Sequence, residues 1–134
     1  MNSPDRLRQH PDDRLAPPVQ MFALAAVAER LRAEPHPSVA GHRQLAIVRH
    51  GPVTVILFTF EVNGQMKQHR AEGAVTIHVL TGRLEVVVED QRLELGMGEL
   101  LALAPGLPHS LRALESSDML LTVHLLPAVS PDVT

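Results

Sequence analysis

Short runs in which apolar and polar residues alternate, separated by glycine-containing turns, dominate the chain between residues 64 and 114. Residues 83–89 follow a period of two, which puts three apolar side chains on one face of an extended strand, Leu84, Val86 and Val88. Residues 74–80 are mostly β-branched or apolar, which also suits a strand. Gly82 separates the two runs, because glycine adopts positive φ without a steric penalty. The pattern predicts paired strands in this part of the chain.

A proline-rich corner follows the last of these runs. Gly98-Glu99 precedes an apolar run over residues 100–104, and the segment Pro105-Gly106-Leu107-Pro108 then leads directly into His109. Two prolines around one glycine restrict the backbone, so that the side chain that follows is aimed reproducibly. The position of His109 therefore makes it a candidate functional residue.

This arrangement resembles the second sequence motif of the cupin superfamily, in which a glycine–acid pair, an apolar strand, a proline–glycine corner and a histidine follow one another. The resemblance covers roughly Pro52 to Leu126. It implies an all-β fold, the antiparallel double-stranded β-helix or jelly-roll barrel, here preceded by one N-terminal helix. The chain contains no internal repeat, so it is similar to the small single-domain cupins of bacteria and not to the tandem ones.

The first cupin motif is only partly kept. His69 stands at the first histidine and Gly82 at the glycine, but Ala71 takes the place of the second histidine and Val75 that of the glutamate. The resemblance implies a metal inside the barrel, held by imidazoles and a carboxylate, and this donor set suits Mn, Fe, Ni or Zn. With two of four positions lost, only His69 and His109 are left as metal ligands, and we expect a low metal affinity.

The same two histidines form the centre of the predicted ligand site. The short side chains of Ala71 and Val75 are expected to enlarge an apolar pocket with two imidazoles at one end, which is the usual character of a small-molecule site. The predicted ligand-binding residues are His69, His109, Val75, Ile77 and Leu111. The first hypothesis is therefore a small-molecule-binding cupin with a degenerate metal site, and no catalytic residue is assigned.

Two other functions stay open. One is a metal-dependent enzyme of the isomerase or oxygenase type that uses the two-histidine site, where an imidazole could also act as acid or base because it titrates near neutrality. The other is a structural or regulatory dimer whose barrel is filled by side chains. Metal content distinguishes the enzyme from the binding protein, and the volume of the internal cavity distinguishes the filled barrel from both.

The rest of the chain divides around the barrel. Residues 1–16 combine charges with prolines and are predicted to form a flexible arm, and Pro17-Pro18 is expected to begin a helix over residues 17–34. The apolar stripe of this helix consists of Met21, Leu24, Ala28 and Leu31. The barrel is expected over residues 41–127, and residues 128–134 form a tail.

Two outward-facing features suggest a protein partner. Val53–Phe60 is apolar on both faces, so this strand is expected to be covered on both sides, and we predict a homodimer because C2 pairing is the commonest assembly. His78 and His124 are expected to point out of the barrel from neighbouring strands and to contact each other. They would form a hydrogen-bonded face under a helix or subunit, or else an intersubunit metal site or pH-sensitive interface.

Composition argues against several other classes of protein. A net charge of −3 at pH 7 and the absence of Tyr and Trp argue against nucleic acid as the main partner. No apolar run approaches the ~20 residues of a membrane span, so no membrane association is expected. The chain has no cysteine, which excludes disulfides and thiolate chemistry and fits a cytoplasmic location. Its 134 residues fit one domain.

Overall fold

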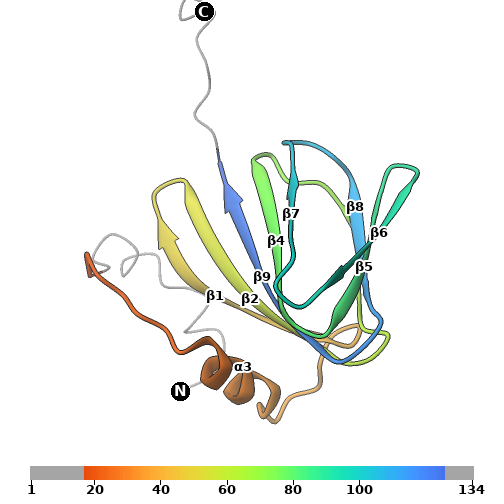
Figure 1. The fold of residues 1–134 in the computed structure, drawn as a ribbon. Helices are drawn as coiled ribbons and strands as arrows, with labels where there is room; N and C mark the ends of the chain where they lie inside the picture. Colours follow the sequence, from red (N-terminus) through yellow and green to blue (C-terminus); the bar gives the residue numbers. More distant parts are fainter. Residues whose placement is uncertain (1–16, 126–134) are drawn as a thin grey trace, which may run out of the picture.

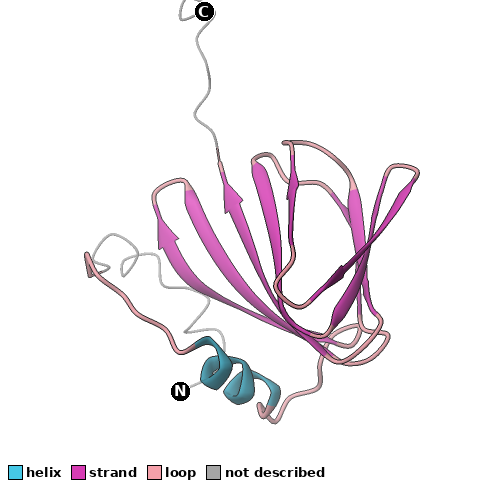
Figure 2. Cartoon of the chain, viewed as in Figure 1, coloured by secondary structure: helices cyan, strands magenta, loops and turns pink. Residues whose placement is uncertain are grey.

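The structure is a computed structural model that describes residues 17–125, and in it two antiparallel sheets face each other with one helix on the outside (Figure 1). One sheet has five strands in the order β1-β2-β9-β4-β7, and the other has four strands in the order β3-β8-β5-β6. The strands dominate the described part of the chain, as Figure 2 shows. The predicted all-β jelly-roll barrel with one N-terminal helix is confirmed.

The five-stranded sheet is built from β1 (His42–His50), β2 (Val53–Phe60), β9 (Ser117–His124), β4 (Ala74–Thr81) and β7 (Leu100–Leu103). The four-stranded sheet is built from β3 (Gln65–His69), β8 (His109–Ala113), β5 (Arg83–Val88) and β6 (Gln91–Gly96). Within residues 17–125 the helix is α3 (Leu24–Arg32). The chain moves between the sheets several times, so that strands distant in sequence become neighbours.

Inward-facing residues of both sheets form one apolar core. In β4 the side chains of Val75, Ile77 and Val79 are buried and those between them are half-buried, as expected for a strand with one face on the core. In β5 the buried residues are the three that the alternation predicts, Leu84, Val86 and Val88. The five-stranded sheet adds further members to the same cluster, among them Phe58, Phe60, Met119 and Leu121.

Gly82 connects β4 to β5 and also lies against the start of β9. Its φ is +90°, a value that side chains other than glycine rarely adopt. A Cβ atom at this position would lie 2.2 Å from the Oγ of Ser117, which in turn accepts a hydrogen bond from the Arg83 amide at 3.0 Å. The glycine of the first motif is therefore required both by backbone conformation and by close packing between the sheets.

The helix is shorter than the sequence indicates. It begins at Leu24, and residues 17–23 lie outside it, so that Met21 is 93% exposed and takes no part in the buried stripe. Ala28 and Leu31 are buried as expected, because α3 packs on β1 and β2. Helical structure therefore persists where packing supports it. No helix among the described residues is long and apolar enough to cross a membrane.

The strands begin at His42 and end at His124, inside the predicted barrel over residues 41–127. The predicted arm over residues 1–16 and tail over residues 128–134 lie outside the described residues, as do the last two residues of the predicted barrel.

Strand β2 is covered on both faces over half of its length. Leu57, Phe58, Thr59 and Phe60 are all at most 3% exposed, whereas the residues from Val53 to Ile56 are half-buried. Inward residues contact the barrel core, and α3 covers the outward ones. An ion pair of 2.5 Å between Arg32 and Asp118 fixes the end of the helix over this region. The helix thus supplies part of the second cover that the apolar strand requires.

The prediction for His78 and His124 is right about the face and wrong about the contact. Their strands are neighbours, and His78 alternates with the buried residues of β4. The register, however, places His78 opposite Leu120 and His124 opposite Ala74, which separates the histidines by about 13 Å along the strands. Thr76 and Thr122 face each other between them. Register depends on long-range pairing, which the local alternation does not determine.

Candidate two-histidine site

His69 and His109 meet at one end of the four-stranded sheet. His69 is the last residue of β3, His109 is the first residue of β8, and the two are register partners. Their ring centroids lie 4.3 Å apart with the rings tilted by 59°. His109 is only 1% exposed, whereas His69, on the edge strand, is exposed. The sequence-predicted pair is therefore brought together, with one imidazole inside the protein and one at its surface.

Both imidazoles are held through the same ring nitrogen. The Nδ1 of His69 lies 3.1 Å from the carbonyl oxygen of Lys67, and the Nδ1 of His109 lies 3.1 Å from that of Leu107. A carbonyl oxygen only accepts hydrogen bonds, so each neutral ring donates its Nδ1 proton to it. The Nε2 atom of each ring then keeps a free lone pair. This is the tautomer that can accept a hydrogen bond or bind a metal.

The proline-rich corner positions His109. Leu107 belongs to the corner, and its carbonyl fixes the imidazole two residues later. The amide of Gly106 donates a hydrogen bond of 2.9 Å to the carbonyl of Ala71, which joins the corner to the loop that follows His69. The two sequence motifs are thus connected through their backbones, and the side chains they carry are placed relative to each other.

The Nε2 atom of His109 is buried and has no hydrogen-bond partner in the described part of the chain. Such an unpaired buried group costs about 1–3 kcal/mol. Burial lowers the pKa of His109 from its ordinary value of 6.5; the Leu107 carbonyl acts in the opposite direction, and nearby His69 lowers it further. The ring is therefore neutral at neutral pH, and its Nε2 is available as an acceptor.

The two positions at which this chain lacks the metal ligands of the first cupin motif, Ala71 and Val75, lie in or against the apolar core. Val75 is 3% exposed and belongs to the core, and Ala71 is partly buried against it. Glu72, in the same loop, is exposed. No group of three or more His, Cys, Asp or Glu residues among residues 17–125 could hold a metal ion. The donor set of the described residues is thus the two imidazoles alone, which fits a complete metal site poorly.

The other predicted ligand-binding residues lie in the core. Ile77 is fully buried, and Leu111, on β8 like His109, is 3% exposed. A residue without exposed surface borders no space large enough for a water molecule. Contact between a ligand and Ile77 would therefore require neighbouring side chains to move, and the contact stays a prediction.

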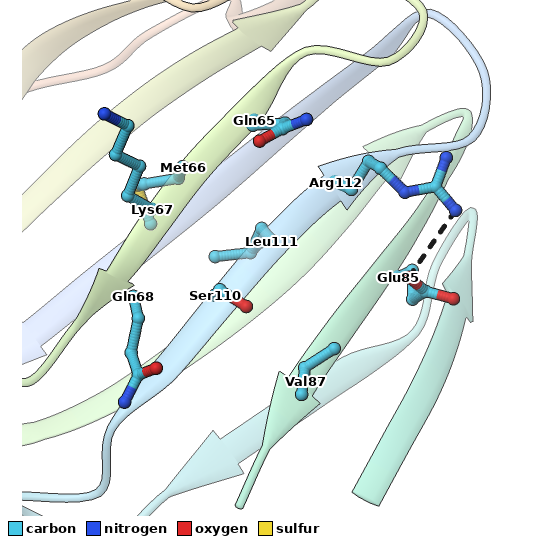
Figure 3. Close-up of a pocket in the computed structure, with 9 residues that line it drawn as sticks. All are labelled: Gln65, Met66, Lys67, Gln68, Glu85, Val87, Ser110, Leu111 and Arg112. Atoms are coloured by element: carbon cyan, nitrogen blue, oxygen red, sulfur yellow. Dashed lines mark ion pairs between the residues drawn. The ribbon is translucent and has the colours of Figure 1, made fainter.

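A groove of about 360 Å³ that the sequence alone does not reveal lies on the outer face of the four-stranded sheet. Figure 3 shows its polar side chains, with Lys67 and Gln68 from the edge strand on one side and Glu85 and Arg112 on the other. Glu85 pairs with Arg112 at 3.6 Å and with Arg92 at 3.0 Å. Alternation places Glu85 and Arg112 outside the core, whereas Lys67 and Gln68 are consecutive residues at the register shift of β3. The side-by-side arrangement of these residues follows from strand order.

Comparison with known proteins identifies the family. The model of the cupin domain family matches residues 56–125. A cupin superfamily protein from Desulfitobacterium hafniense has a similar structure, with a TM-score of 0.67 and 17% identity over 82% of this chain and 94% of the other. A conserved protein of unknown function from Streptococcus pyogenes gives a TM-score of 0.62 and 21% identity, over 66% of this chain and 78% of the other.

A larger protein shares the fold as well. Salicylate 1,2-dioxygenase from Pseudaminobacter salicylatoxidans gives a TM-score of 0.64 and 17% identity, over 74% of this chain and 31% of that enzyme. No curated protein matches the sequence. At these identities the structural likenesses concern the fold alone, whereas the family match covers more than half of the sequence. The chain belongs to the cupin domain family.

Proposed function

We propose that this cupin binds a small molecule with a polar head and a largely apolar body, and that His69 and His109 contact the head. One observation carries the proposal: the Nε2 of His109 is buried, unpaired and close to a second imidazole. A protein gains stability when a ligand supplies the missing partner, because the cost of the unpaired group then disappears.

The state of the imidazoles defines the head group. Both rings donate through Nδ1 to backbone carbonyls, so both Nε2 atoms act as acceptors. A hydroxyl group or a protonated amine would satisfy them. A carboxylate, which only accepts, would require protonated rings, and the lowered pKa of His109 opposes this. We therefore expect alcohols or amines to bind better than carboxylates of the same length.

Access to the site depends on His69. This residue is exposed and ends β3, which among the described strands pairs with β8 alone and has a register shift between Met66 and His69. Edge strands with such irregularities have fewer backbone bonds to break than central ones. We propose that displacement of His69 opens the path to His109, and that Val75, Ile77 and Leu111 then contact the apolar body of the ligand.

A metal-dependent enzyme of the isomerase or oxygenase type is the second candidate. It is favoured by the free Nε2 atoms of both histidines, which present the nitrogen lone pairs that Mn, Fe, Ni or Zn would require. It is opposed by Ala71 and Val75, which provide no ligand atoms. The third candidate, a structural or regulatory dimer with a filled barrel, is favoured by the full burial of Ile77.

The proposal also includes a cytoplasmic homodimer. The outer face of the five-stranded sheet is only partly covered by α3, and beyond it Val53 and Val55 are half-buried while Leu100 is 63% exposed. Apolar side chains in this arrangement suit a contact with a second copy.

Two measurements test the proposed function. Titration of the protein with 1-hexanol, hexylamine and hexanoate, followed by NMR, should show binding of the first two near His109, and the double variant His69→Ala, His109→Ala should lose it. His50→Ala is the matched control, because this histidine is also exposed but lies on β1. Calorimetric titration with Mn, Fe(II), Ni and Zn tests the enzyme alternative. Tight stoichiometric metal binding that the double variant loses would contradict the proposal and favour the enzyme.

A further inference from the structure

A second cavity lies outside the barrel, where the chain leaves α3 and enters β1. Its volume is about 300 Å³, which is at the small end of ligand pockets. Its apolar lining residues include Leu31, Pro37 and Val39, and Arg43 contributes a positive charge. This pocket shares no lining residue with the two-histidine site.

Arg43 is the unusual residue of this pocket. Its Nη1 atom is buried and has no hydrogen-bond partner in the part of the chain that the structure describes. An arginine side chain stays protonated in proteins, so it cannot reduce the cost by losing its charge. A buried donor on a charged group that finds no acceptor is among the more costly features of a folded protein. An acceptor for Arg43 is therefore expected.

The neighbouring carboxylates already have other partners. Asp118 lies in the same row of the sheet as Arg43, with Thr59 between them, but it pairs with Arg32 at 2.5 Å. Glu61 accepts a hydrogen bond of 2.7 Å from Ser38. Glu34 pairs with His36 at 3.2 Å. None of these carboxylates accepts a hydrogen bond from the Nη1 of Arg43. A ligand that carries an acceptor could supply the missing partner.

We propose that the pocket binds a small organic monocarboxylate whose oxygens pair with the guanidinium of Arg43. The planar guanidinium matches a carboxylate through two parallel hydrogen bonds. The walls formed by Leu31, Pro37 and Val39 suit a short aliphatic chain. The carboxylate of Glu34 also lines the pocket and repels a doubly charged phosphate more than a single negative charge. Because Nη1 itself is covered, binding includes a rotation of the guanidinium toward the pocket.

Titration with sodium butyrate, followed by NMR at constant ionic strength, tests the site. The expected result is saturable shifts at Leu31, His36 and Arg43, with sodium chloride producing none and inorganic phosphate binding more weakly. Arg43→Gln should weaken butyrate binding about tenfold or more, because it removes a charge-assisted pair. Arg43→Lys should weaken butyrate binding less, since lysine keeps the positive charge and loses only the paired donors of the planar guanidinium. Arg49→Gln, an exposed arginine on the same strand, is the matched control and should bind as the wild type does.

The melting temperature with and without butyrate provides a second test, because a purely structural role of Arg43 would not make stability depend on butyrate. Without butyrate, Arg43→Gln should melt no lower than the wild type, because it removes an unpaired buried cation; with butyrate, only the wild type and the control should gain stability. The inference is overturned if Arg43→Gln binds butyrate as tightly as the wild type, if phosphate binds more tightly than butyrate, or if Arg43→Gln is destabilised without butyrate. The double variant His69→Ala, His109→Ala should keep the butyrate response, which separates this site from the proposed function.

Discussion

Restoring the two lost motif residues should convert this chain into a metal-binding protein. The perturbation is the pair Ala71→His and Val75→Glu, which adds an imidazole and a carboxylate to His69 and His109. Val75 is 3% exposed, so its replacement forfeits about 1.5–3 kcal/mol of apolar burial. The carboxyl group adds about 1–3 kcal/mol where it finds no partner. The metal-free variant should therefore lose about 2.5–6 kcal/mol, a large part of the 5–15 kcal/mol typical of domains.

Metal binding should return much of that loss. A ligand present at 100 times its Kd stabilises the folded state by about 2.7 kcal/mol. At about 4 °C per kcal/mol for a domain of this size, the variant should melt 10 °C or more below the wild type without metal and regain about 10 °C with it. The wild type, with two imidazoles and no third ligand among the described residues, should respond little.

Scanning calorimetry with EDTA, Mn, Ni and Zn measures both effects. The control carries the same two substitutions in a His109→Ala background, which removes the buried ligand and should abolish the gain. If metal leaves the melting temperature of the restored variant unchanged, residues 71 and 75 do not lie where a four-ligand site requires them. If metal raises the melting temperature of the wild type as much as that of the variant, the absence of ligands at residues 71 and 75 does not weaken metal binding.

Three further predictions concern stability and assembly. Gly82→Ala should cost roughly 3 kcal/mol or more in urea unfolding, because it combines positive φ with a Cβ atom 2.2 Å from the Ser117 Oγ; a loss below about 1 kcal/mol would contradict this account. The pKa of His109 is lower in the folded than in the unfolded protein, so its contribution to stability is present above pH 6.5 and lost as pH falls below that value. His109→Gln should therefore lose less stability than the wild type as pH falls below 6.5, and an equal loss would argue against a lowered pKa of His109. Equilibrium sedimentation should give a dimer at micromolar concentration that Leu100→Glu weakens, and a wild-type monomer would refute the expected assembly.

The sequence predicts those parts of the fold that depend on local periodicity. The alternation in residues 83–89 correctly puts Leu84, Val86 and Val88 on one buried face, because a strand has a period of two, and residues 74–80 form the predicted strand. The proline-glycine corner leads directly into His109, and the carbonyl of Leu107 in that corner holds its imidazole. The pairing of His69 with His109 follows from the family resemblance and not from periodicity.

The errors arise where distant parts of the chain decide the outcome. The helix begins at Leu24, packs on β1 and β2 and buries Ala28 and Leu31, and the sequence around Pro17 does not contain the information on that packing. His78 and His124 miss each other because of strand register. The unpaired Arg43 was unpredictable for the same reason, since its burial depends on how residues 34–39 fold back against β1.

The hydrogen bond from Gly106 to Ala71 makes the two motif loops one mechanical unit at the end of the barrel. Neither loop can swing outward alone without breaking this bond, whereas movement of both together preserves it. The amide of Gly106 is therefore a natural reporter in hydrogen–deuterium exchange. Its exchange rate measures how often the loops separate, and a molecule seated against His109 should slow that rate while leaving distant amides, such as those of α3, unchanged.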